Sequence, residues 1–177
     1  MKDKTFDMRE ARGLAARWAL SVGLWWTASF ASLVYSLSRP GLGLLQWVFA
    51  LLSVVVLVRC VRRYATEVSG MGFLRRWWLS WTTCLNAALL TTLAQYLYFR
   101  FLDKGHMLGS MRATMERKEV RQMMAERLPG FDFDAQLELM SQMTLGDITA
   151  SLLLTNLTAA VVVGLLAALL SRPRTEN

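Results

Sequence analysis

Four long stretches of the chain contain no Asp, Glu, Lys, Arg or His. These uncharged runs extend from Trp18 to Ser38, Pro40 to Val58, Trp77 to Phe99 and Ile148 to Ser171. Each reaches or approaches the roughly 20 residues that a helix needs to cross the ~30 Å hydrocarbon core of a bilayer. One charge at mid-span costs about 3 kcal/mol on insertion scales, so four such runs are unlikely to arise by chance. The pattern predicts four membrane-spanning helices.

Neither a soluble helical protein nor a cleaved signal peptide fits the uncharged runs as well. Buried helices of a soluble protein keep a polar stripe, whereas Phe49 to Val58 and Ala159 to Leu170 have almost none. A cleaved signal peptide would account only for the first run. That run is longer than the usual apolar region of about 7–15 residues, and three Trp interrupt it. We therefore expect the first run to be an uncleaved span.

The segment between the third and fourth runs is rich in Met and in charges of both signs. It has few turn-forming residues apart from Pro129 and Gly130, and most of its residues favour helix. We expect two helices here, Lys104 to Leu128 and Asp134 to Leu145, with a hinge at Leu128–Pro129–Gly130. Asp132 or Asp134 is suited to cap the second of them, and Asp147 to cap the fourth span.

The apolar face of the first expected hairpin helix changes direction partway along it. One set of side chains steps by four along one face, and a second set does so along nearly the opposite face: Met107, Met111, Met115, then Val120, Met124, Leu128. The change falls at Glu116 to Glu119. Either the helix kinks there, or it presents two patches, one to the bilayer and one to its partner helix.

These elements predict an all-α fold. We expect an integral membrane four-helix bundle that forms a single domain over residues 1–177. An extramembrane, Met-rich helical hairpin, residues 104–147, is inserted between the third span (77–99) and the fourth (148–171).

Charge gives this bundle an orientation. The chain is 54% hydrophobic and carries a net charge of +7. Basic residues cluster in the N-terminal tail, between the second and third runs, and in the C-terminal tail: Lys2, Lys4, Arg9, Arg12, Arg17; Arg59, Arg62, Arg63, Arg75, Arg76; Arg172, Arg174. The positive-inside rule then places both termini in the cytoplasm and the hairpin outside, in the periplasm of a Gram-negative cell. The bilayer accounts for the positive charge, so we expect no nucleic-acid partner.

The exit from the third run carries a family resemblance. The motif YLYFRFLD, Tyr96 to Asp103, follows a Gly-centred basic loop and precedes the Met-containing segment. In this pattern the chain resembles the bacterial membrane proteins of the "domain of unknown function 4199" family, common in Bacteroidetes, over nearly its whole length. The family more often has Pro where this chain has Lys104, and its outer loop is often more acidic. The resemblance implies the bacterial inner membrane and no known activity.

No arrangement of residues typical of catalysis is present. The sequence has no Ser-His-Asp set, zinc motif, P-loop or paired carboxylates within the runs. We therefore expect a non-enzymatic protein with no catalytic, cofactor-binding or metal-binding residues. One alternative is a Cu(I) site of His106, Met107 and Met111, because thioethers are soft ligands. The simpler interpretation is that these methionines fill gaps between packed helices.

Transport is the alternative function. Asn86 and Asn156 lie nearest the middle of the third and fourth runs, and each is suited to a hydrogen bond between helices. The sharper alternative is a small oligomeric transporter or channel with a polar path near Asn86 and Asn156, also lined by Thr83 and Thr91. The leading expectation is that the outer hairpin is an interaction surface for an envelope protein or for the membrane surface.

Two stripes of small residues predict close helix contacts. They are Ala28, Ser32 and Ser36 in the first run and Ala160, Gly164 and Ala168 in the fourth. Small residues allow helix backbones to approach closely in lipid. We expect these stripes to face other helices, either within the bundle or in a second copy of the chain.

Overall fold

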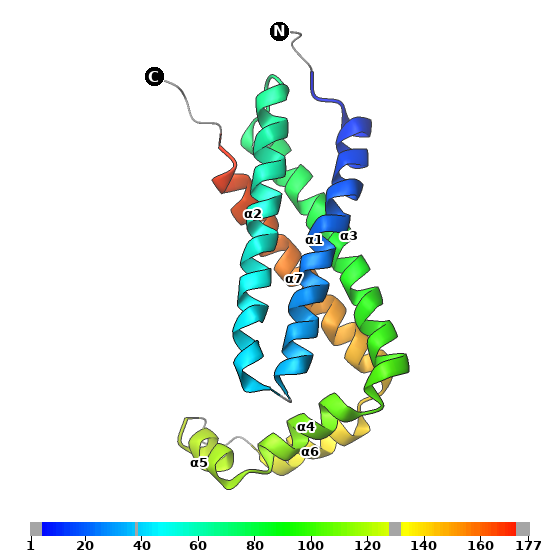
Figure 1. The fold of residues 1–177 in the computed structure, drawn as a ribbon, viewed down its shortest axis with the longest axis vertical. Coiled ribbons are helices and arrows are strands. Elements are labelled where there is room, and N and C mark those ends of the chain that lie inside the picture. Colours follow the sequence, from blue (N-terminus) through cyan, green and yellow to red (C-terminus); the bar gives the residue numbers. More distant parts are fainter. Residues whose placement is uncertain (1–4, 38, 128–131, 173–177) are drawn as a thin grey trace. The chain divides into compact units, whose positions relative to one another are not determined.

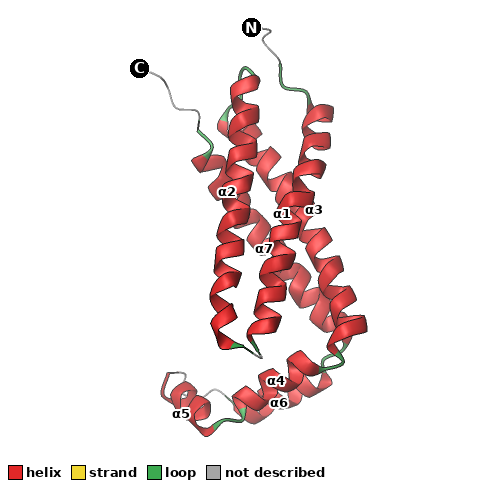
Figure 2. Cartoon of the chain, viewed as in Figure 1, coloured by secondary structure: helices red, strands yellow, loops and turns green. Residues whose placement is uncertain are grey.

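The computed structural model describes residues 5–37, 39–127 and 132–172. Every regular element in these ranges is helical, with seven α-helices and no strand (Figure 2). The prediction of an all-α fold is confirmed. The chain divides into two compact units: Met1–Gln95 with Leu152–Asn177, and Tyr96–Ser151.

Four long helices build the first unit (Figure 1). They are α1 (Met8–Ser36), α2 (Gly43–Glu67), α3 (Phe73–Tyr98) and α7 (Leu145–Leu170), and each contains most of one uncharged run. The last turn of α3, from Tyr96, and the first two turns of α7, through Ser151, belong to the second unit. A 3₁₀ turn, η1 (Pro40–Leu42), lies between α1 and α2, where Pro and Gly disfavour a continuous α-helix.

The basic segment between the second and third runs is mostly helical, which corrects the expectation of a loop there. Helix α2 continues to Glu67 and α3 begins at Phe73. Arg and Glu are good helix formers, so the end of an uncharged run does not end the helix. Gly70, between α2 and α3, interrupts the helical conformation with a φ of +73°, a left-handed value that favours glycine.

Small side chains make up much of the buried centre of the first unit. This core consists of Ala19, Val22, Leu57, Val61, Cys84, Ala87, Ala88, Ala160 and Ala167. Side chains also join α1 to α2, since Trp26 Nε1 donates to Ser53 Oγ at 3.0 Å and Ser29 Oγ donates to the Gln46 carbonyl at 2.9 Å. Short side chains and direct polar contacts hold these helices close together.

Two of the four long helices, α2 and α7, are long and apolar enough to cross a membrane. In their most apolar stretches, only 17% of α2 and 22% of α7 is buried, whereas the core helix of a soluble protein is mostly buried. Helices α1 and α3 are as long, but Trp, Ser and Thr are interspersed along them and lower their hydropathy. Of the four helices predicted to span a membrane, α2 and α7 therefore have the length and composition to do so.

The second unit contains one π-helical turn and three short helices. These are η2 (Phe99–Asp103), α4 (His106–Met115), α5 (Lys118–Arg127) and α6 (Phe133–Gln142). Of the two alternatives for the helix expected from Lys104 to Leu128, the structure has the interruption: α4 ends at Met115 and α5 begins at Lys118, where the apolar face changes direction. A continuous helix over this range is wrong. The expected hinge at residues 128–130 lies outside the described residues.

Hydrogen bonds mark the ends of these short helices. The backbone N–H of Arg117 donates to the Thr114 carbonyl at 3.3 Å, a tighter turn than the α-helix makes. Asp132 caps α6, since its Oδ1 accepts from the backbone N–H groups of Asp134 and Ala135 at 3.1 and 3.0 Å. Of the two expected caps for this helix, the structure uses Asp132.

The start of α7 has a reciprocal cap. Thr144 Oγ1 accepts from the Asp147 N–H at 3.2 Å, and Asp147 Oδ2 accepts from the Thr144 N–H at 2.9 Å. This is a capping box, in which two side chains satisfy each other's backbone donors. Asp147 was expected to cap the fourth span, and it does so together with Thr144: Thr144 is at the cap position and Asp147 lies in the first turn.

Candidate functional site

A polar contact in the first unit joins α3 and α7. The amide nitrogen Nδ2 of Asn156 donates to Thr92 Oγ1 at 2.9 Å and to Gln95 Oε1 at 2.8 Å. Thr92 and Gln95 are buried, and Asn156 is half-buried. Both N–H groups of the Asn156 amide therefore have acceptors on the neighbouring helix, which is the arrangement of a polar tie between helices.

The other residues of the possible polar path are engaged elsewhere. Thr83 Oγ1 donates to the Leu79 carbonyl of its own helix at 2.8 Å. Thr91 Oγ1 donates to the Gly23 carbonyl of α1 at 3.4 Å. Both threonines are buried, and Asn86 is half-buried and takes no part in the Asn156 contact.

Sequence reasoning missed Thr92 and Gln95 as partners of Asn156. A signal for them was present, because residues three apart on a helix share a face. Thr92 and Gln95 meet this condition on α3, and Cys84 and Ala88 continue the same face into the buried core. The face was visible in the sequence, but the register between α3 and α7 was not.

The small-residue stripe of α7 lies against α3. Ala160, Gly164 and Ala168 are all buried. A Cβ atom built on Gly164 would lie 3.1 Å from Cα and 3.2 Å from the backbone nitrogen of Trp81. The stripe is thus a helix contact within one chain, as one of the two alternatives expected. Self-association through it stays a prediction.

The expected stripe of α1 reaches α2 at its carboxyl end. Ser32 is buried, and a Cβ atom on Gly43 of α2 would lie 3.7 Å from Ser36 Cβ. Ser36 thus packs beside the start of α2 within one chain.

The family-like segment forms a compact corner in the second unit. Asp103 is buried at the end of η2, and its Oδ1 accepts from Tyr98 OH at 3.1 Å and from the Met107 N–H at 3.0 Å. The following residues, Lys104 and Gly105, have φ of +46° and +82°. One carboxylate therefore links the end of α3 to the start of α4 across a left-handed turn.

The possible copper ligands lie on α4. His106 and Met111 are exposed, and Met107 and Met115 are half-buried. Within the described ranges, no group of three or more His, Cys, Asp or Glu side chains is placed to hold a metal ion. Cu(I) binding by these thioethers remains the alternative interpretation. The two cysteines, Cys60 and Cys84, are free.

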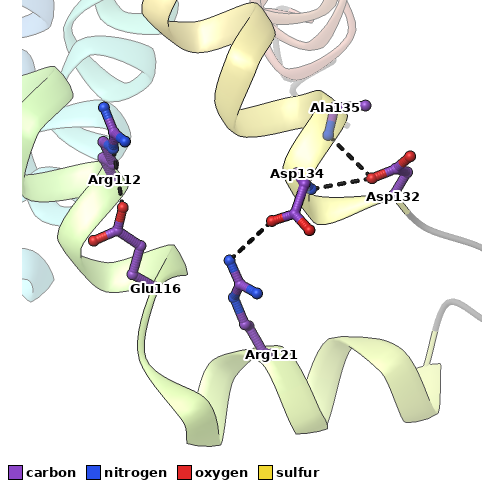
Figure 3. A network of polar contacts seen from close by, with 6 residues as sticks. All are labelled: Arg112, Glu116, Arg121, Asp132, Asp134 and Ala135. Carbon is purple, nitrogen blue, oxygen red and sulfur yellow. Dashed lines mark hydrogen bonds and ion pairs between the residues drawn. The ribbon is translucent and has the colours of Figure 1, made fainter.

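Charged side chains join the short helices of the hairpin (Figure 3). Arg121 Nη2 of α5 pairs with Asp134 Oδ1 of α6 at 3.2 Å, and Arg112 pairs with Glu116 at 2.9 Å across one turn. These side chains are substantially exposed, and exposed ion pairs contribute about 0–1 kcal/mol each. The Arg121–Asp134 pair therefore adds little stability to the contact between α5 and α6.

The comparison with known families gives one match. The model of the family described as "Protein of unknown function (DUF4199)" matches residues 17–172, which is most of the chain. This confirms the resemblance seen in the sequence, while the Bacteroidetes type is not addressed by the match. No curated protein and no solved structure shows significant similarity to the chain.

Proposed function

The chain belongs to the DUF4199 family of proteins of unknown function, and from that premise we propose a non-enzymatic role in the bacterial inner membrane. In this proposal α1, α2, α3 and α7 all cross the bilayer. Both termini are cytoplasmic, and the hairpin of residues 104–147 faces the periplasm. The hairpin is the interaction surface, either for an envelope protein or for the surface of the membrane.

The observation that carries the proposal is the outward exposure of large apolar side chains on all four long helices. Leu20 of α1 is 63% exposed, Leu51 of α2 66%, Leu93 of α3 55% and Leu154 of α7 67%. Burying a leucine gains about 1.5–3 kcal/mol relative to leaving it in water. Large apolar side chains exposed along every long helix are unusual for a soluble protein. Contact with lipid acyl chains removes the free-energy cost of exposing these leucines on all four helices.

The orientation follows from charge, because the basic residues gather at the ends of the helices expected to be cytoplasmic. The helical extension of α2 carries Arg59, Arg62 and Arg63 beyond its uncharged run. Side chains of this kind reach the headgroups from a helix end, so their position on helix rather than loop is compatible with the proposed topology.

The interaction role of the hairpin is supported by its mixed surface. Met111, Met123 and Leu139 are exposed large apolar side chains among many charges. Methionine is flexible and polarizable, and it is common on surfaces that adapt to a partner. The rival role, an oligomeric channel, gains no such support, since both N–H groups of Asn156 are already bound to α3.

Cysteine labelling in intact cells tests the topology. In a Cys60→Ser, Cys84→Ala background, Ser110→Cys is expected to react with an impermeant maleimide. The matched control Thr66→Cys, exposed on the basic extension of α2, is expected to react only after the cells are opened. The reverse pattern contradicts the orientation. Recovery of the intact protein in a detergent-free soluble extract contradicts membrane insertion itself.

Deletion of residues 107–143 tests the interaction role separately. Affinity capture from native membranes after crosslinking is expected to lose the partners that the full chain retains. An unchanged set of captured proteins and an unchanged membrane fraction would argue against the hairpin as the contact surface.

A further inference from the structure

The first turns of α3 carry a buried arginine without a partner. Arg76 is 6% exposed, and its Nε and Nη1 are buried with no hydrogen-bond acceptor in the described structure. One turn further on, Ser80 is fully buried and its Oγ also has no partner. The buried Nε1 of Trp77, between them in sequence, is unpaired as well. All of these groups can donate a hydrogen bond.

The geometry of a helix places these donors together. Residues four apart, such as Arg76 and Ser80, lie on one face. Helical side chains lean toward the amino end, which directs the Arg76 side chain toward the first turn of α3. There the backbone N–H groups and the helix dipole already favour negative charge. The complement of this set is an anion with several acceptor oxygens.

Burial makes such a complement necessary. An isolated charge away from water is strongly unfavourable, and buried charges in proteins are paired. Guanidinium groups bind phosphate through two parallel hydrogen bonds. We propose that Arg76 and Ser80 form a binding site for a phosphate-type oxyanion at the amino end of α3.

The proposed membrane role indicates where the phosphate would come from, and this step rests on it. Arg76 immediately precedes the uncharged run that begins at Trp77, a position at headgroup level. The two sources are therefore a phospholipid headgroup and free phosphate.

Arg75 provides the matched control. It is the neighbouring arginine on α3, but it is exposed and already engaged. Its Nη1 donates to the Gly70 carbonyl at 3.1 Å, and its guanidinium lies 5.1 Å from the centre of the Phe6 ring. Arg75→Gln removes the same charge as Arg76→Gln without removing the buried donors.

The test uses the full-length protein in detergent, with native mass spectrometry and thermal unfolding as the two measurements. The probes are phosphatidylglycerol, diacylglycerol as the lipid without phosphate, and inorganic phosphate. Phosphatidylglycerol is expected to bind and raise the unfolding temperature, and diacylglycerol is not. Arg76→Gln is expected to weaken binding about tenfold, equivalent to ~1.4 kcal/mol, while Arg75→Gln binds as the wild type does.

Thermal unfolding without any probe gives an independent readout. Arg76→Gln is expected to be at least as stable as the wild type, because it removes an unpaired buried charge. Ser80→Ala is a smaller change and is expected to weaken binding a few-fold. It replaces Arg76→Gln in the binding test if Arg76→Gln does not fold. Binding of inorganic phosphate alone supports the site with free phosphate as its ligand. Binding of neither phosphate probe, or equal binding by both arginine variants, overturns the site whatever membrane fractionation shows.

Discussion

The close approach of Gly164 to the backbone of Trp81 leads to a prediction that substitutions at three glycines can test. A Cβ atom on Gly164 would lie 3.1 and 3.2 Å from the Cα and nitrogen of Trp81. A Cβ atom on Gly23 would lie 3.5–3.6 Å from atoms of Ala87 and Leu90, which is ordinary contact. A Cβ atom on Gly13 would meet nothing within 4 Å. The three positions are all helical and differ in the space available.

Replacement of each glycine by alanine is expected to separate two effects. Alanine in a helix interior is favoured over glycine by about 1 kcal/mol, and this gain is common to all three sites. At Gly164 the clash is with backbone, which a side-chain rotation does not relieve, so α3 and α7 have to separate slightly. Overpacking of this kind costs about 1–3 kcal/mol. Gly164→Ala is therefore expected to be about 1–3 kcal/mol less stable than Gly13→Ala.

The assay is unfolding of the purified variants in one detergent, followed by tryptophan fluorescence. Seven Trp are present, and Trp81 lies at the contact, so its emission is expected to change with Gly164→Ala and not with Gly13→Ala. Gly23→Ala is the control within an uncharged run and is expected to be no less stable than the wild type. If Gly164→Ala is as stable as Gly13→Ala, the close approach of α7 to α3 is refuted.

Three further predictions concern the polar contacts. Asn156→Leu is expected to lose about 1–2 kcal/mol of stability, because hydrogen bonds between membrane helices contribute about 0.6–2 kcal/mol; Asn86→Leu in the same unfolding assay is expected to stay near the wild type. A double-mutant cycle tests the bond between Tyr98 and Asp103. Tyr98→Phe is expected to lower the free energy of unfolding by about 1 kcal/mol in the wild type and by much less in the Asp103→Ala background, because a hydrogen bond contributes about 0.5–1.5 kcal/mol. Additive losses would contradict the observed bond. Arg121→Gln is expected to change stability by less than about 1 kcal/mol, and a larger loss would show that the α5–α6 pair is more than a surface contact.

The sequence located the centres of the long helices better than their ends. Charge is excluded from the uncharged runs by the surroundings of the helix, whereas the ends of α2 depend on local backbone preferences. The residues from Arg59 to Glu67 favour helix and continue it, and the chain turns only at Gly70, where φ is positive. A search for charges alone places the boundary about two turns too early.

The break between α4 and α5 was visible in the sequence only as an ambiguity. The apolar face reverses at Glu116 to Glu119, but every residue there is compatible with helix, and a continuous helix with two patches fits the same pattern. The choice depends on tertiary contacts. Helix α4 contacts both α5 and α6, and the exposed Arg121–Asp134 pair adds one surface contact between α5 and α6.

The partners of Asn156 were the part of the candidate site that sequence reasoning could not supply. An asparagine near the centre of an apolar helix predicts a hydrogen bond, but its reach is short, so the acceptor depends on the register and rotation of the neighbouring helix. Gly164, about two turns away on α7, sets both by allowing the Trp81 backbone to within close contact. At that separation Thr92 and Gln95 come within 2.9 and 2.8 Å of the Asn156 amide. The glycine therefore has two roles: it permits the close packing of α7 on α3, and it brings the Asn156 amide to its acceptors on Thr92 and Gln95.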